Sequence, residues 1–278
     1  MTDKTTNTGM PSFILVATDG SDDCAGAIRT GLALAQSRGA RLIGLSIALD
    51  NPEYSTLVPN LHEVIEARAR EALKSFILEA GERAEVTTRR ASDPAEGIVS
   101  AAGELGADLV VLAESDKGGL TRVMVGDTTA NVIGLATCPV LVVPRSAHLW
   151  DKRILVATDG SPHSGSAVET AGQFARAAGL PLNVVSVVTS SHSESRRKDA
   201  ERAVAAALER MQALGVQAEG AVEEGRPDEA IVKMAESVRA DLIVVGSHGR
   251  TGLAKILLGS VAQRVIGHAA CPVLVVKS

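Results

Sequence analysis

Aromatic residues are almost absent from this chain: they make up 2% of its 278 residues, whereas apolar residues as a group make up 45%. The core must therefore be built from aliphatic side chains and alanine, a composition typical of buried parallel strands covered by helices. Long apolar runs are also lacking, because none approaches the ~20 residues that span a bilayer. The first residues, MTDKTTNTG, contain no apolar stretch of the kind found in a signal peptide. We therefore expect a soluble, cytoplasmic protein that does not contact membranes.

Cysteine is scarce as well, with Cys24, Cys138 and Cys271 as the three examples. Three cysteines cannot form a disulfide framework, and their spacing to one another and to histidines does not suit a zinc site. Cys138 and Cys271 each precede a proline at the start of an expected strand, which favours small buried thiols. The net charge of −5 argues against nonspecific nucleic-acid binding as the main function.

What the chain does contain is a repeat. The sequence ILVATDGS occupies residues 14–21 and again 154–161, and CPVLVV occupies residues 138–143 and 271–276. The first pair is offset by 140 positions (154 − 14) and the second by 133 (271 − 138), so two collinear units differ by seven residues. Repetition on this scale indicates a duplicated domain. We predict one domain over residues 1–146 and a second over 147–278, and we expect the seven extra residues within 50–60.

Apolar runs alternate with helical patterns in both units. Each unit opens with a strand, an Asp-Gly-Ser turn and a helix, and in the second unit Ser161 is the expected N-cap before Pro162. Strands that alternate with helices become parallel neighbours joined by right-handed crossovers. The predicted fold is therefore α/β, with a doubly wound five-stranded parallel sheet in each unit and the two units in a pseudo-two-fold tandem. The expected strands are 13–17, 41–48, 84–89, 107–113, 138–143, 154–157, 182–188, 216–222, 240–246 and 271–276; among the expected helices are 61–80, 195–213 and those starting at Pro94 and Pro227.

The loop after the fourth strand of the second unit carries a glycine pattern. Two residues separate Gly246 from Gly249, and nine separate Gly249 from the pair Gly259-Ser260. Glycine lets backbone N–H groups approach an anion without an intervening Cβ atom, and the free N–H groups at a helix start attract negative charge. Since ligands of such sheets bind beyond the carboxyl ends of the strands, the pattern predicts a nucleotide-phosphate site. His248 and Arg250 can add donors or charge to it.

At these motifs the chain resembles the universal stress protein family, as a tandem two-domain member. The resemblance rests on the Gly-x2-Gly-x9-Gly-Ser spacing, on GSHGRTG, and on the VATDGS and CPVLVV segments. It implies that the second domain binds ATP or ADP, with or without Mg²⁺, and serves a stress-response role. The implied contacts are Ala157 and Asp159 at the adenosine, the backbone of Val187 at the adenine edge, and Gly246, His248, Gly249, Gly259, Ser260 and Val261 around the phosphates.

The first unit departs from this pattern. By the offset of 133, Ala113, Glu114, Asp116 and Asp127 stand where the second unit has Gly246, Ser247, Gly249 and Ser260. Carboxylates at these positions disfavour a polyanion, so we expect a degenerate first site. The acidic residues are either a solvated loop or, together with Asp19, a site for a divalent cation or a basic partner. Asp127 before Thr128 also fits an ordinary N-cap.

Signatures of catalysis are missing. The chain has no Walker sequence and no GxGxxG after its first strand, which favours nucleotide binding and regulation over turnover. His248 is interpreted as a donor, and His62, His148, His163, His192 and His268 as surface or helix-end residues. Two alternatives stay open: a slow ATPase or nucleotidyl-transfer enzyme, and a nucleotide-independent interaction scaffold for an unknown protein partner. Pairing of the two CPVLVV strands would cover both edges, and a homodimer is a further expectation.

Overall fold

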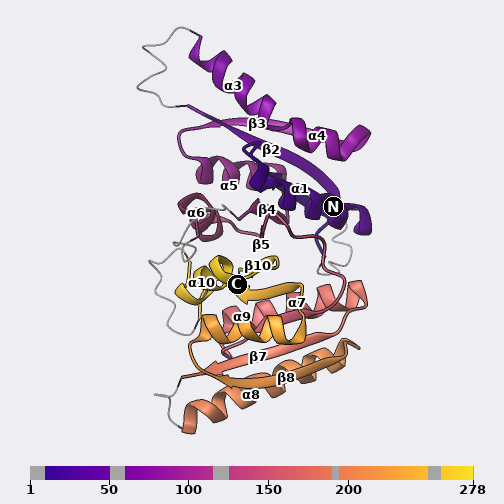
Figure 1. Cartoon of the computed structure of the whole chain (residues 1–278), viewed down its shortest axis with the longest axis vertical. Helices are drawn as coiled ribbons and strands as arrows, with labels where there is room; N and C mark the ends of the chain where they lie inside the picture. The colour runs from indigo at the N-terminus through magenta and orange to yellow at the C-terminus, as the bar shows by residue number, and fades with distance from the viewer. Residues whose placement is uncertain (1–9, 51–59, 115–124, 190–193, 250–257, 278) are drawn as a thin grey trace, which may run out of the picture. The chain divides into compact units, whose positions relative to one another are not determined.

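The computed structural model describes residues 10–50, 60–114, 125–189, 194–249 and 258–277, which divide into two compact units (Figure 1). One unit consists mainly of Ser12–Leu149 and the other mainly of the residues from Trp150 on. In the described part of the chain, no helix has both the length and the apolar character needed to cross a bilayer.

The first unit holds a five-stranded sheet in which every recorded strand pairing is parallel, in the order β3-β2-β1-β4-β5. The order reverses between β1 and β4, because the chain builds outward from β1 on one side and then returns to its other side. Its elements are β1 (Phe13–Ala17), η1 (Asp22–Cys24), α1 (Ala25–Arg38), β2 (Arg41–Leu49), α3 (Leu61–Ala72), α4 (Lys74–Ala80), η2 (Gly81–Arg83), β3 (Glu85–Ala91), α5 (Pro94–Leu105), β4 (Leu109–Ala113), α6 (Asp127–Leu135) and β5 (Val140–Val143).

The second unit repeats this arrangement in the order β10-β9-β6-β7-β8, again with parallel pairs. Its elements are β6 (Ile154–Ala157), α7 (Pro162–Ala178), β7 (Leu182–Val188), α8 (Glu194–Ala213), β8 (Ala218–Glu224), α9 (Pro227–Val238), β9 (Leu242–Gly246), α10 (Ser260–His268) and β10 (Val273–Val276). Helix α7 packs against α8, and α9 packs against α10. The predicted doubly wound parallel sheet is thus confirmed in each unit.

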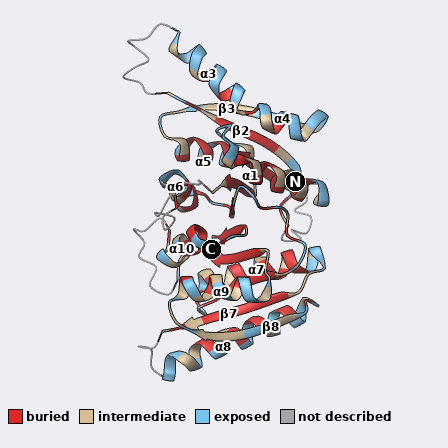
Figure 2. Ribbon diagram, in the orientation of Figure 1, coloured by how far each residue is buried: buried red, intermediate tan, exposed pale blue. Residues whose placement is uncertain are grey.

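The burial of the strands explains their composition. Inner strand β7 is almost wholly buried, whereas edge strand β8 is half-buried or exposed along its length (Figure 2). Strands covered on both faces read as continuous aliphatic runs, as LNVVSVV does apart from its two polar residues, while the edge strand AEGAVEE carries charge. The core of each unit therefore lies along its inner strands. A binding site is expected beyond the carboxyl ends of these strands.

Two helix predictions need correction. The helix expected over 61–80 is interrupted at Leu73. The break lets the side chains of Leu73 and Phe76 both enter the core, where they are 2% and 0% exposed. Gly44 makes room for the ring of Phe76, since a Cβ atom there would lie 2.7 Å from it. In the first unit the helix after the Asp-Gly-Ser turn begins only at Ala25, after the 3-10 turn η1. The third strand of each unit, β3 or β8, begins and ends one or two residues later than expected. Most of the expected insertion within 50–60 lies outside the described residues.

Candidate functional site

The turn after β6 fixes Asp159 at the carboxyl edge of the sheet. Thr158 N donates a hydrogen bond to the carbonyl of Val185 on β7 over 2.9 Å, and Ser161 N donates to Asp159 Oδ1 over 2.9 Å. Ser161 is the N-cap of α7, as predicted, and its hydroxyl accepts from Ser164 N at 3.3 Å with Pro162 at the first helical position. The turn therefore holds the Asp159 carboxylate in one place before any ligand arrives.

The glycine loop starts beside this turn. A Cβ atom on Gly249 would lie 2.9 Å from Asp159 Oδ2, and one on Gly246 would lie 3.0 Å from the backbone carbonyl of His163. Ser247 N donates to the carbonyl of Val276 on β10 over 3.0 Å, which anchors the start of the loop to the sheet. These approaches explain why glycine occupies both positions: the loop backbone packs directly against Asp159 and the first turn of α7.

The far end of the loop returns to its start. Gly259 N donates to the carbonyl of Ser247 over 2.9 Å, and a Cβ atom on Gly259 would lie 3.0 Å from that same oxygen. Gly259 is the N-cap of α10, which begins at Ser260 as the sequence predicts, and the first helical hydrogen bond is donated by Gln263 N to the carbonyl of Gly259. The amides of Ser260 and Val261 precede that bond and belong to the set that a helix start offers to anions.

Two histidine rings meet at the site. His163, in the first turn of α7, lies with its ring 5.4 Å from that of His248, at an angle of 48°. His248 Nδ1 also lies 3.1 Å from the hydroxyl of Ser247. Sequence reasoning identified His248 but assigned His163 only to a helix end. The signal that could have found it is its place two residues after the N-cap of a helix that starts at the ligand edge.

Three other predicted contact residues lie on strands and helices of the second unit. Ala157 ends β6, Val187 is half-buried on β7 opposite Glu223 of β8, and Val261 is half-buried in the first turn of α10. Arg250 lies outside the described residues. The structure thus brings Asp159, Gly246, His248, Gly249 and Gly259 together and adds His163 to them.

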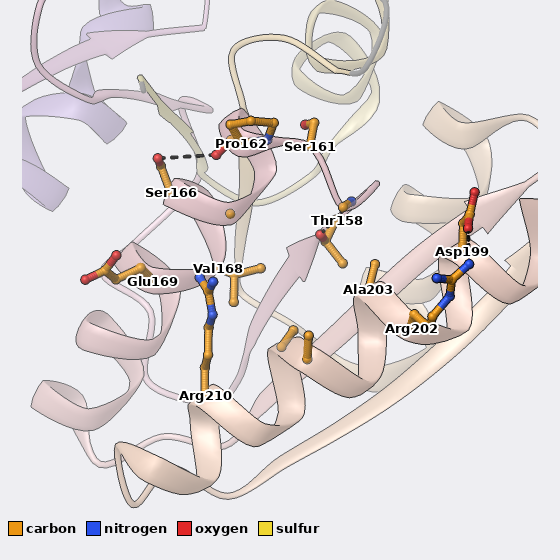
Figure 3. A pocket seen from close by; sticks show the side chains of 14 residues that line it. Thr158, Ser161, Pro162, Ser166, Val168, Glu169, Asp199, Arg202, Ala203 and Arg210 are labelled. Carbon is orange, nitrogen blue, oxygen red and sulfur yellow. Dashed lines mark hydrogen bonds and ion pairs between the residues drawn. The ribbon is translucent and has the colours of Figure 1, made fainter.

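A pocket of about 650 Å³ adjoins this edge, between α7 and α8 (Figure 3). The pocket begins at the turn after β6, and part of its lining consists of small apolar residues. Helix α8 contributes two arginines, Arg202 and Arg210, and Arg202 donates to Asp199 Oδ1 over 2.6 Å. Its described lining residues are Thr158, Gly160, Ser161, Pro162, Gly165, Ser166, Val168, Glu169, Asp199, Arg202, Ala203, Ala206, Ala207 and Arg210, and they include none of the predicted contacts. The pocket is therefore a neighbour of the glycine loop and is not formed by it.

The equivalent turn in the first unit is covered. A Cβ atom on Gly20, the counterpart of Gly160, would lie only 2.6 Å from the Cα atom of Ala72 at the end of α3. The helix break at Leu73 follows directly. A backbone packed this close leaves no room for a ligand beside Gly20, whereas Gly160 lines an open pocket.

The carboxylate at the end of β1 in the first unit is held by two hydrogen-bond donors. Asp19, the counterpart of Asp159, accepts from Ser21 N at 2.9 Å and from the Cys24 thiol at 3.3 Å. Burial by itself would raise the pKa of Asp19, but these hydrogen bonds outweigh it and leave the pKa below its ordinary value. Burial raises the pKa of Cys24, so a neutral thiol donates to an ionised carboxylate.

The acidic positions of the first unit also lie at the ligand edge where they are described. Glu114 N donates to the carbonyl of Val143 over 2.8 Å, the same bond that Ser247 makes with Val276. The N-cap of α6 is Gly126, with Asp127 as the first helical residue, so the N-cap prediction for Asp127 is wrong. Asp116 lies outside the described residues. Within the described ranges, no cluster of three or more His, Cys, Asp or Glu side chains could hold a metal ion.

Comparison with known proteins identifies the family of this chain. The sequence model of the universal stress protein family matches residues 11–144 and 152–277. A universal stress protein of Methanocaldococcus jannaschii is 38% identical over 139 residues, which cover 45% of this chain and 82% of that protein. One of Thermus aquaticus is 38% identical over 135 residues, which cover 45% of this chain and 98% of that protein.

The fold of the whole chain also has a solved counterpart. The crystal structure of a universal stress protein from Archaeoglobus fulgidus DSM 4304 covers 98% of both chains with a TM-score of 0.75 at 22% identity. At that identity the likeness supports the fold alone. Since the family's sequence model matches both halves, this chain belongs to the universal stress protein family and carries two of its domains in tandem.

Proposed function

We propose that this protein binds ATP or ADP in its second domain and acts as a nucleotide-dependent regulatory protein of the stress response. The observation that carries the proposal is the convergence of Asp159, Gly249 and Gly259 at one edge of one sheet. The loop backbone is drawn in so closely that side chains would collide with Asp159 Oδ2 and with the Ser247 carbonyl. A backbone cradle of this kind, ending at a helix start, suits the phosphates of a nucleotide.

The side chains at this edge can contact both the phosphates and the ribose of a nucleotide. Two imidazole rings, His163 and His248, stand at the loop and serve as hydrogen-bond donors to phosphate oxygens. Asp159, held by the amide of Ser161, is placed to accept from the hydroxyls of a ribose. Mg²⁺, when bound, would neutralise phosphate charge, and no step in the proposal depends on it.

The first domain supplies an internal contrast. Its loop substitutes carboxylates at the positions of Ser247 and Ser260, and its turn glycine is covered by Ala72. A carboxylate about 4 Å from a phosphate charge costs roughly 4 kcal/mol at an effective dielectric of ~20. We therefore assign nucleotide binding to the second domain and a structural and regulatory role to the first.

The test is a reciprocal exchange between the two helix starts. Ser260→Asp places a carboxylate at the first residue of α10, and Asp127→Ser removes one from the first residue of α6. Titration calorimetry with ATP should give one site per chain for the natural protein, no measurable binding for Ser260→Asp, and unchanged affinity for Asp127→Ser. Equal affinity in all three proteins would contradict the proposal.

Two further measurements address the other classes of function. Release of ADP and phosphate from ATP, abolished by Ser260→Asp, would favour a slow ATPase over a pure binding protein. Sedimentation with and without ATP tests whether nucleotide binding changes self-association. We propose that the protein acts in the cytoplasm and that nucleotide occupancy controls contact with a second copy or a protein partner.

A further inference from the structure

The second domain buries a carboxylate outside the residues discussed so far. Asp228 is 1% exposed in the first turn of α9, and its Oδ2 atom lies 3.0 Å from Arg226 Nη2. Its Oδ1 atom lies 3.6 Å from Arg264 Nη1, on α10. Oδ1 has no hydrogen-bond partner within the described part of the chain, so the ion pair with Arg264 is its recorded interaction.

A buried carboxylate requires opposite charge, because its loss of hydration is otherwise uncompensated. The start of α9 contributes favourable dipole charge, and Arg226 contributes a hydrogen bond. Arg226 is shared with the exposed Glu229, which it contacts at 2.7 Å. Arg264 is therefore the partner that connects Asp228 to another helix, and the pair links the first turn of α9 to the second turn of α10.

Arg264 lies close to the start of α10, where the glycine loop ends. It lies four residues after Ser260, one helical turn from the amides that start α10. The N-cap of α10 is a glycine, which has no side chain to hold the helix start, and the recorded bond there is the one from Gly259 N to Ser247. The register of α10 against the loop thus depends on contacts further along the helix.

The first domain lacks the whole arrangement. At the positions of Arg226, Asp228 and Arg264 it has Asp93, Ala95 and Asn131. Ala95 is buried like Asp228, at 1% exposure, and the Asp93 carboxylate caps α5 by accepting from Glu96 N over 2.9 Å. The fold therefore does not require a charged residue at this position. The ion pair occurs in the half of the chain that carries the glycine pattern.

We propose that Asp228 is a positioning residue of the nucleotide site: through Arg264 it fixes α10 so that the amides of Ser260 and Val261 face the phosphates. This inference rests on the proposed function for its ligand. It concerns the phosphate end of the site and leaves the adenosine end at Asp159 unaffected. The contact itself is a property of the protein without nucleotide and can be tested there.

The experiment compares Asp228→Asn with Glu229→Gln. Both remove one acidic charge from the first turn of α9 and one partner of Arg226, but only the first breaks the link to α10. Hydrogen exchange of the protein without nucleotide should be faster over residues 258–268 in Asp228→Asn and unchanged over α7. The Kd for ATP should rise about tenfold, a coupling of about 1.4 kcal/mol, while the Kd for adenosine stays the same. Glu229→Gln should match the natural protein in each measurement.

Arg264→Gln provides a second route to the same contact if Asp228→Asn does not fold. It leaves Asp228 paired with Arg226 and should reproduce the exchange and affinity changes. Unchanged exchange over 258–268 overturns the inference, and so does faster exchange across the whole domain or an equal loss of ATP and adenosine affinity. Absence of ATP binding in the natural protein overturns the proposed function instead, and the exchange data then still decide whether Asp228 positions α10.

Discussion

Gly249→Asp gives the second domain the residue that the first domain has at this position, and its effect follows from the geometry. A Cβ atom at Gly249 would lie 2.9 Å from Asp159 Oδ2, so the introduced side chain enters the space between the loop and Asp159. The introduced side chain meets Asp159 Oδ2 on the far side, which adds a steric cost that any uncharged side chain of the same size would share. The main cost is electrostatic, because a new carboxylate faces both Asp159 and the phosphates.

The magnitude can be worked from Coulomb's law. One unit charge about 4 Å from another interacts by about 4 kcal/mol at an effective dielectric of ~20, and about 4 kcal/mol corresponds to roughly a thousandfold in Kd. Since part of the interaction is exposed to solvent, the penalty should shrink as salt is added. We expect Gly249→Asp to weaken ATP binding by about two to three powers of ten.

Gly249→Asn is the matched control for that change. It introduces a side chain of the same size without the charge, so it keeps the steric effect and removes the electrostatic one. Calorimetric titration with ATP at low and at raised salt should separate the two variants, with Gly249→Asn binding far more tightly than Gly249→Asp. Equal affinities of the two variants, or natural affinity in Gly249→Asp, would refute the reasoning that phosphates lie in this loop.

Three further predictions concern other parts of the chain. Gly44→Ala should lower the free energy of unfolding by about 1–3 kcal/mol in urea titrations, because its Cβ would lie 2.7 Å from the ring of Phe76; an unchanged midpoint would contradict this packing. Because the pKa of Asp19 is lowered, its ionised form contributes stability that is present above the ordinary value of 3.8 and is lost as pH falls below it. Asp19→Asn should therefore be less stable than the natural protein at pH 6, with a smaller difference at pH 3, and a constant difference would show that the charge has no role. Burial, with the nearby charge of Asp241, raises the pKa of the half-buried Cys271 thiol to about 12. Iodoacetamide should therefore label Cys271 far more slowly in the folded protein at pH 8.5 than in urea, as peptide mass spectrometry can measure, and rapid labelling of the folded protein would contradict the raised pKa.

The repeat made most of the fold predictable. Matching ILVATDGS and CPVLVV segments located the first and last strands of both units, and alternation of strands with helices fixed the parallel sheets. The break at Leu73 was missed because helical periodicity continues through it, whereas the packing of Phe76 against Gly44 joins residues far apart along the chain. The late start of α1 was missed because Ser21, unlike its counterpart Ser161, makes no side-chain cap hydrogen bond, and the 3-10 turn η1 precedes the helix.

The candidate site was predicted in part. Glycine spacing identified Gly246, Gly249 and Gly259, because close backbone approach leaves a signature in the sequence. The contact of His163 with His248 and the link from Asp228 to Arg264 join residues far apart along the chain, and neither pair has a sequence motif. Such contacts depend on the exact position and rotation of each helix on the sheet. Residue patterns predict that position only to within about one helical turn.

The proposed function requires that the second domain, and not the first, holds an adenine nucleotide. The most direct measurement is to denature the purified protein, identify and count the released nucleotide by chromatography, and titrate the emptied protein with ATP by calorimetry. We expect one adenine nucleotide site per chain. Two sites would contradict the loss of function assigned to the acidic first loop, and no release together with no binding would contradict nucleotide binding itself.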